Sequence, residues 1–149
     1  LTWLPDQPYF KGSWGYIEGK ARSTTSEIEN TTDGPLYQTW RENLRAYQID
    51  APSGTYEVEL LMADVSRSRP QLANLLGRGD DGQAIADSRF NITICGRRME
   101  TAFSPADGGH YRQAFRRRYI IQNKENKIDV LFETLKGKCH LAGIKIRKL

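Results

Sequence analysis

Few side chains in this sequence of 149 residues could carry out acid–base or nucleophilic chemistry. A histidine can act as a general base near neutral pH, and the chain has two, His110 and His140. His110 lies in a glycine-rich turn, and His140 falls on the same expected strand face as Ala142 and Ile144, so neither pattern favours a base. Asp80 and Asp81 could form a carboxylate pair, but adjacent acids in a glycine-rich loop are usually solvated.

The sequence also lacks the longer motifs that accompany catalysis. It contains no Gly-x-Ser-x-Gly elbow, no phosphate-binding glycine loop and no His or Cys spacing typical of a metal site. A glycosidase needs two carboxylates on opposite sides of one bond, and no such pair stands out. We therefore expect no enzyme activity from this chain alone, no cofactor and no catalytic metal; a structural cation is left open.

Aromatic side chains offer a binding function instead. They are concentrated in the N-terminal part of the chain, at Trp3, Tyr9, Phe10, Trp14 and Tyr16, followed by Tyr37 and Trp40. Faces of sugar rings stack on aromatic rings, while sugar hydroxyls bind amide, carboxylate and guanidinium groups. The alternative is that these rings are core residues or anchor the N-terminal segment, since Trp and Tyr bury large areas.

Charge is unevenly distributed. The net charge is +4, but residues 110–149 carry eleven Lys or Arg and three acids, or +8, which leaves −4 for residues 1–109. A basic segment can attract nucleic acid, but no nucleic-acid-binding motif accompanies it. Strands with one buried face place Lys and Arg on the other face, and we favour this interpretation, so no nucleic-acid partner is expected.

Composition excludes several other classes. The chain is 38% hydrophobic with a mean hydropathy of −0.64, and no apolar run is long enough to span a bilayer, so membrane insertion is not expected. Cys95 and Cys139 form no metal-binding spacing; one disulfide or two free thiols are both open. Because the chain begins with Leu1, we expect it to be a piece of a longer protein.

Alternation of apolar and polar residues with a period of two dominates the second half of the sequence. Tyr56, Val58, Leu60 and Met62 share one expected face, with Glu57 and Glu59 on the other. Similar patterns predict strands over 37–41, 45–49, 90–94, 97–103, 114–122, 127–133 and 142–147. Short strands separated by turn residues, without a sustained helical stripe, predict an all-β fold, an antiparallel β-sandwich. We expect its buried positions to include Tyr56, Val58, Leu60, Phe90, Ile92, Ile94, Val130, Phe132, Ile144 and Ile146.

Two regions do not follow this pattern. Residues 1–35 are rich in aromatics, Gly, Ser and Thr, and we expect an irregular arm there. Residues 65–88 form a loop of 24 residues in which only Leu72–Leu76 could form a turn or two of helix. Long loops at one end of a sandwich often carry binding sites.

Five segments, in the same order, resemble elements of malectin-like domains. They are 9–16 (YFKGSWGY), 33–41 (DGPLYQTWR), 54–64 (GTYEVELLMAD), 89–97 (RFNITICGR) and 141–146 (LAGIKI). The chain is similar over nearly its whole length to the malectin-like domains attached to bacterial, Bacteroidetes-type, β-galactosidase-like glycoside hydrolases.

The resemblance implies a single domain over residues 1–149, a β-sandwich of jelly-roll, galactose-binding-like type. It implies a non-catalytic carbohydrate-binding module that brings an attached glycoside hydrolase to a glycan by raising its effective concentration. The expected partners are an oligosaccharide or polysaccharide and the catalytic domain of the same parent chain. The expected location is secreted, periplasmic or at the cell surface.

The sequence departs from the family at two sugar contacts. Malectin places an aromatic pair after the third of these segments, where this chain has Ser66 and Arg67. Malectin also has an acid before its closing strand, where this chain has Lys136-Gly137-Lys138. Carried onto this chain, the family's binding rim predicts as candidate sugar-binding residues Trp14, Tyr16, Tyr37, Ser66, Arg67 and Lys136.

The missing loop aromatics support an alternative function. In it, the domain is a structural accessory that packs on the catalytic domain and binds no sugar. The aromatic N-terminal arm favours the binding function instead.

Overall fold

The computed structural model of this chain describes residues 2–63, 88–105 and 113–149. Of these residues, 61% lie in strands and 4% in helix. Within the described ranges there is one short helix, α1 (Gly34–Tyr37), and the strands are β1 (Trp14–Ile17), β2 (Lys20–Ser23), β3 (Thr39–Glu42), β4 (Ala46–Asp50), β5 (Gly54–Ala63), β6 (Arg89–Ile94), β7 (Arg97–Phe103), β8 (Ala114–Asn123), β9 (Lys127–Lys136), β10 (His140–Leu141) and β11 (Gly143–Lys148).

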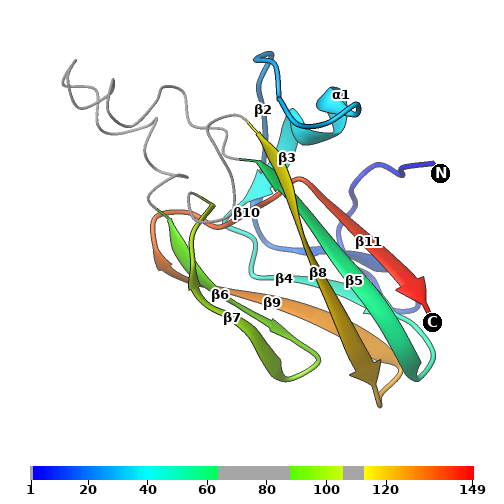
Figure 1. Cartoon of the computed structure of the whole chain (residues 1–149). Coiled ribbons are helices and arrows are strands. Elements are labelled where there is room, and N and C mark those ends of the chain that lie inside the picture. The colour runs from blue at the N-terminus through cyan, green and yellow to red at the C-terminus, as the bar shows by residue number, and fades with distance from the viewer. Residues whose placement is uncertain (1, 64–87, 106–112) are drawn as a thin grey trace.

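The strands form two main sheets that face each other (Figure 1). One sheet has the order β1-β4-β9-β6-β7 and the other the order β11-β5-β8; a small sheet, β10-β3-β2, lies at one end. Every pair of these strands is antiparallel. The expected all-β antiparallel sandwich is confirmed.

The core between the two sheets comes from the alternating residues of both. The central strand β5 turns Tyr56, Val58, Leu60 and Met62 inward, all buried. The facing sheet contributes large apolar side chains from β4, β6 and β9: Tyr47, Phe90, Ile92, Ile94, Ile128, Val130 and Phe132. Removal of these side chains from water is the main force that holds the sheets together.

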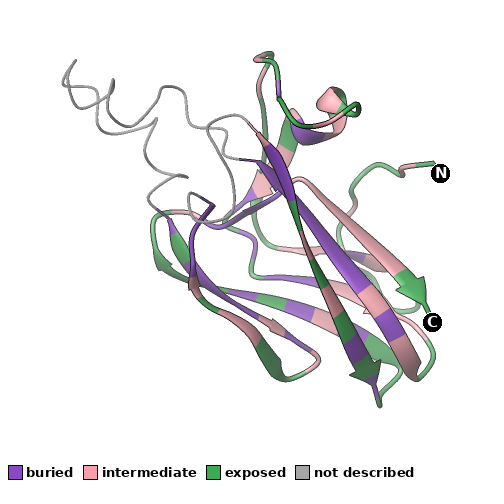
Figure 2. Ribbon diagram, viewed as in Figure 1, coloured by how far each residue is buried: buried purple, intermediate pink, exposed green. Residues whose placement is uncertain are grey.

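A second apolar cluster lies on the outer face of the β11-β5-β8 sheet. Leu61 and Ala63 of β5 point outward there and are buried beneath Tyr37 of α1 and Ile28. The segment that precedes β3 therefore covers one end of this face, as Figure 2 shows by the purple patch on α1. The rest of the face carries charged side chains, of which Glu59 is buried and Arg116 is largely exposed.

The structure corrects the prediction for the first 41 residues. The expected irregular arm contains two strands, β1 and β2, and the expected strand 37–41 divides into α1 and β3. Pro35 in the first turn of α1 presets the helical φ, which explains the local helix. Strands β1 and β2 are too short and mixed in composition to show a period of two.

At the C-terminal end, two further predictions are wrong. The single expected strand 142–147 is β11, and His140 lies in a different sheet, so His140 and Ile144 do not share a strand face. Ile144 and Ile146, predicted to be buried, are only half-buried, because β11 is an edge strand. The other predicted core residues, on β5, β6 and β9, are buried: Tyr56, Val58, Leu60, Phe90, Ile92, Ile94, Val130 and Phe132.

Both cysteines are free thiols. Cys139 is fully buried and Cys95 is half-buried, and burial raises the pKa of each thiol. Residues 65–87 of the expected loop, with the expected helical turn Leu72–Leu76, lie in the part of the chain outside the described residues.

Candidate functional site

The N-terminal arm, residues 2–13, lies along the open side of the sandwich, where strands β1 and β11 form the edges of the two sheets. The arm is fastened to β1 by backbone contacts, because Tyr16 N donates to the Gln7 carbonyl at 2.9 Å and Tyr9 N to the Tyr16 carbonyl at 3.0 Å. Asp50 of β4 accepts hydrogen bonds from the Gly12 amide at 2.6 Å and from the Tyr9 hydroxyl at 2.9 Å. These bonds lower the pKa of Asp50.

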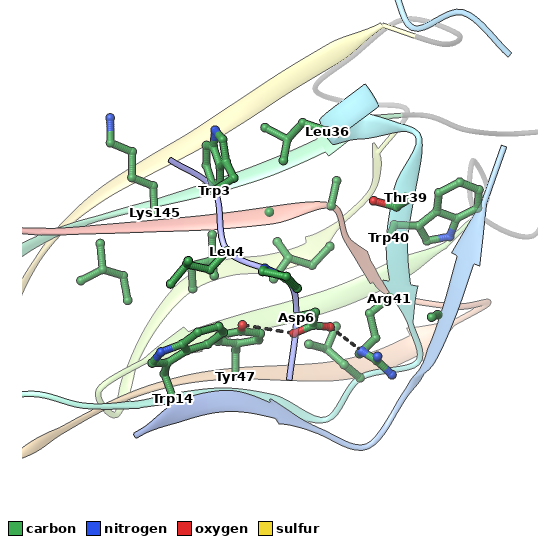
Figure 3. Close-up of a pocket in the computed structure, with 18 of the residues that line it drawn as sticks. Trp3, Leu4, Asp6, Trp14, Leu36, Thr39, Trp40, Arg41, Tyr47 and Lys145 are labelled. Carbon is green, nitrogen blue, oxygen red and sulfur yellow. Dashed lines mark hydrogen bonds and ion pairs between the residues drawn. The ribbon is translucent and has the colours of Figure 1, made fainter. Parts of the chain in front are cut away.

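Asp6 holds the other end of the arm. Its Oδ2 accepts a hydrogen bond from Arg41 Nε at 2.8 Å, and its Oδ1 accepts one from the Tyr47 hydroxyl at 3.2 Å (Figure 3). Burial, with the neighbouring carboxylate, raises the pKa of Tyr47. The Arg41 guanidinium also lies over the ring of Tyr16, 3.4 Å from its centroid, so that ring face is already covered.

A pocket of about 720 Å³ lies between the arm and the two sheet edges, and we call it the apolar pocket. Figure 3 shows the arm crossing it from Trp3 to Asp6, with Leu4 between them. Trp14 and Tyr47 stack on one another on its wall, with their ring centroids 6.5 Å apart. Aliphatic side chains form most of the remaining wall: Leu36, Leu44, Ile49, Leu141, Ile144 and Ile146.

A second pocket of about 500 Å³ lies on the outer face of the β11-β5-β8 sheet, and we call it the polar pocket. Antiparallel register sets its floor, since Lys145 pairs with Glu59, and Leu61 pairs with Arg116. One wall is Trp3 of the arm. The opposite wall comes from the segment before β3 and includes Asn30, Thr31, Thr32, Asp33, Leu36 and Tyr37.

Electrostatics in the polar pocket centre on Glu59, which is only 3% exposed. Its Oε1 accepts a hydrogen bond from Arg116 at 3.1 Å, and its Oε2 accepts two from Arg118, from Nε at 3.3 Å and from Nη2 at 3.2 Å. Burial alone would raise the pKa of Glu59, but the two guanidinium groups outweigh it and lower the pKa below its ordinary value. The hydrogen bond between Arg116 and Glu59 also raises the pKa of Arg116. The floor of the pocket is therefore a fixed, fully ionised pair.

The two pockets adjoin. Trp3, Leu36 and Lys145 line both of them. The Trp3 ring lies against β11 at Gly143, where a side-chain carbon would be 3.6 Å from Trp3 Cζ3. Trp3 therefore lies between the polar pocket and the apolar pocket and lines both.

The residues predicted to bind sugar do not converge on one place. Trp14 lines the apolar pocket, and Tyr37, which is 3% exposed, lines the polar pocket from within the second cluster. Tyr16 lies under Arg41, and Lys136, at the end of β9, lines neither pocket. Ser66 and Arg67 lie outside the described residues.

Of the residues that line the polar pocket, only Tyr37 was in the predicted site, and the charged side chains of Glu59, Arg116 and Lys145 are among those that were absent from it. Alternation showed that Glu59 and Lys145 sit on polar strand faces, but not which strands are neighbours. Trp3 was recognised as part of the aromatic cluster, although nothing in the sequence placed it beside charged residues.

The described residues offer little for catalysis. His140 is buried and its Nε2 lies 2.8 Å from the carbonyl oxygen of Ala63. Within the same residues, no group of three or more His, Cys, Asp or Glu could hold a metal ion. His110, Asp80 and Asp81 fall in segments that the structure does not describe.

No helix among the described residues is both long and apolar enough to cross a membrane.

Comparison with protein families identifies the family to which this sandwich belongs. The family model of the malectin domain matches residues 1–146. The chain belongs to the malectin domain family. No curated protein matches it.

Among solved structures, this malectin domain is similar to part of a β-glucuronidase from Bacteroides uniformis. The two share 43% sequence identity with a TM-score of 0.85, over 100% of this chain and 16% of the β-glucuronidase chain. This malectin domain therefore corresponds to one part of a much longer glycoside hydrolase chain, which confirms the resemblance to malectin domains of such enzymes.

More distant matches show the fold alone. The plant receptor-like kinase FER has a TM-score of 0.68 at 15% identity, with 93% of this chain and 35% of that chain covered. The ANX1 ectodomain from Arabidopsis thaliana has a TM-score of 0.63 at 15% identity, with 88% of this chain and 40% of that chain covered.

Proposed function

We propose that this malectin domain is a non-catalytic carbohydrate-binding module of a glycoside hydrolase and that the polar pocket is its binding site. The observation that carries the proposal is the composition of that pocket. Trp3, which is half-buried, stands beside amide, carboxylate, ammonium and guanidinium groups from four other segments of the chain. A sugar needs both kinds of surface at once, a ring face for its C–H bonds and planar polar groups for its hydroxyls.

The polar pocket is also built before any ligand arrives. Glu59 and Arg116 fix one another, and Asn30 Nδ2 donates to the carbonyl of Ala114 at 3.0 Å. Asp33 is positioned by a hydrogen bond from its amide to the hydroxyl of Thr31 at 3.0 Å. Preorganised polar groups lose little freedom on binding, which supports affinity for a small ligand.

The charges of the polar pocket suit a hexose that presents several hydroxyls or carries an anionic group such as a uronate or sulfate. Lys145 has no ion-pair partner among the described residues, and Arg116 keeps a side chain that is 62% exposed. Both can approach a ligand carboxylate. The matched structure is named a β-glucuronidase, which makes glucuronides the first glycans to test.

In this proposal the catalytic carboxylates lie elsewhere in the parent chain. A binding module then acts by keeping a glycan near the catalytic domain, so that the second encounter is intramolecular. A glycan-degrading parent of this kind would work outside the cytoplasm, in the periplasm, at the cell surface or in the medium.

One observation favours the alternative, a structural accessory that packs on the catalytic domain. Leu4 and Phe10 of the arm are 67% and 59% exposed, and both are large apolar side chains. Exposed apolar groups of this size often mark a surface that another domain covers. The alternative predicts no glycan binding by the 149-residue chain.

Isothermal titration calorimetry of the 149-residue chain with methyl β-D-glucuronide, methyl β-D-glucoside and their oligosaccharides distinguishes the two functions. We expect binding, and we expect Trp3→Ala and Lys145→Gln to weaken it several-fold, since a lost aromatic contact costs on the order of 1 kcal/mol. Lys136→Gln is the matched control, because Lys136 lines neither pocket. Binding weakened only by Lys136→Gln would place the site at the rim predicted from the family instead.

A further inference from the structure

We infer that the ligand of this malectin domain is a glycoside with an apolar aglycone, whose sugar lies in the polar pocket and whose aglycone lies in the apolar pocket. The inference rests on the proposed function, because it takes the polar pocket as the sugar site. It adds the class of the group attached to the sugar.

The first argument is continuity. Trp3, Leu36 and Lys145 line both pockets, so a ligand that fills the polar pocket has its neighbouring substituent at the mouth of the apolar one. Trp3 can contact both parts of such a ligand. The sugar would stack on the indole, and the group attached to the sugar would pass its edge.

The second argument is the chemistry of the apolar pocket. Its volume of about 720 Å³ is within the range of small-molecule sites. The charged groups at its lower end are already used, because Asp6 pairs with Arg41 and with the hydroxyl of Tyr47. A second sugar would find as polar partners Lys145, the indole N–H of Trp40, which is unpaired among the described residues, and the hydroxyls of Thr2, Ser23 and Thr39. An alkyl or aryl group would instead contact the aliphatic and aromatic side chains that form the larger part of the wall.

The third argument concerns what is left uncovered. Ile144 and Ile146 alternate inward on the edge strand β11, yet both stay half-exposed. The arm lines the same pocket without closing it, and Leu4 of the arm remains largely in solvent. An apolar group that enters the pocket removes this surface from water, which favours binding.

The test is a titration of the 149-residue chain with methyl, butyl and octyl β-D-glucuronides below their micelle concentrations. Burial of each methylene should improve affinity by about three- to fourfold, so we expect octyl to bind at least about tenfold more tightly than methyl. Equal affinities for the three glucuronides would overturn the inference and leave the proposed function standing. Absence of binding by all three would contradict both.

Variants test which pocket holds the sugar and which holds the aglycone. Ile146→Ser should reduce the advantage of octyl over methyl and leave methyl glucuronide unaffected, while Lys145→Gln should weaken all three. Ile120→Ser, on the exposed face of β8, is the matched control and should change nothing. If octanol alone bound as tightly as octyl glucuronide, the sugar would contribute nothing and the inference would be wrong. Because the alkyl series uses the unchanged chain, the inference stays testable even if Ile146→Ser unfolds.

Discussion

Glu59 and Arg116 are 57 positions apart in the sequence, yet the carboxylate accepts a hydrogen bond from the guanidinium at 3.1 Å. The pairing of β5 with β8 brings them together on the outer face of the three-stranded sheet. Glu59 is almost completely buried, whereas Arg116 is largely exposed. The carboxylate is therefore fixed in place as the floor of the polar pocket.

Replacement of Glu59 by Gln should destabilise the domain at pH 7. The carboxylate accepts three charge-assisted hydrogen bonds, one from Arg116 and two from Arg118, and the variant loses their ionic character. Such bonds contribute about 1–3 kcal/mol to the free energy of unfolding. Urea unfolding followed by circular dichroism measures the change. Glu18→Gln is the control, because Glu18 is 62% exposed and its pair with Arg45 is 3.7 Å long; it should shift the free energy by less than about 0.5 kcal/mol.

The same residue predicts a pH dependence. The pKa of Glu59 in the folded domain lies below its ordinary value of 4.5, so the unfolded chain binds this proton more tightly. The stabilisation is complete above pH 4.5 and is lost as the pH falls through the folded pKa. The difference in unfolding free energy between the parent and E59Q should therefore shrink below pH 4.5. A difference that stayed constant from pH 7 to pH 3 would contradict this account.

Phe90 is the residue whose truncation should destabilise the core most clearly. It is fully buried, with ring centroids 5.5 Å from Phe103 and 6.2 Å from Phe132. Phe90→Ala should lower the free energy of unfolding by about 3–5 kcal/mol. Phe10→Ala removes the same atoms from an exposed site on the arm and should cost less than about 0.5 kcal/mol. Similar losses in both variants would mean that the assigned core is wrong.

Gly15 of β1 lies where the arm packs closely against this strand. A β-carbon at this position would collide with the backbone of Gln7 and Tyr9, which cannot move aside as a flexible side chain would. Gly15→Ala should therefore displace the arm and destabilise the domain by about 1–3 kcal/mol. At Gly34 a β-carbon would meet nothing within 4 Å, so Gly34→Ala should be nearly neutral by thermal unfolding. Two equally stable variants would show that the arm does not pack on β1 as described.

Asp6 should control how firmly the arm covers the apolar pocket. Asp6→Ala removes the bonds to Arg41 and Tyr47, and because the carboxylate is 40% exposed we expect a loss of less than about 1 kcal/mol in global stability. The local effect should be larger, with faster amide hydrogen exchange over residues 2–6. Unchanged exchange in this segment would mean that the packing of Trp3 holds the arm without Asp6.

The strands with a strict period of two could be predicted from the sequence because their alternation reflects burial on one face. This holds for β5, β6 and β9, where alternate residues face the other sheet. Strands β1 and β2 could not be predicted in the same way. They are four residues long and obtain their hydrogen bonds from partners far along the chain, which local sequence does not specify.

The position of the polar pocket could not be predicted from the sequence. The excess of aromatics in the first 40 residues, Trp3 among them, favoured a sugar-binding function, which stays a prediction, and it indicated no single place for the site. The register that brings Lys145 beside Glu59, and Arg116 beside Leu61, depends on contacts across the whole sheet. Half-burial of Ile144 and Ile146 likewise follows from the position of β11 at a sheet edge, which alternation alone does not reveal.

The most direct test of sugar binding in the polar pocket uses the indole N–H signals of the three tryptophans in a ¹⁵N–¹H spectrum. Each signal is assigned with a single Trp→Phe variant. On titration with methyl β-D-glucuronide we predict that the Trp3 signal shifts and saturates, while the Trp14 and Trp40 signals stay in place, because only Trp3 lines the polar pocket. A saturating shift of Trp14 or Trp40 with Trp3 unchanged, or no shift in any of the three, would contradict the account.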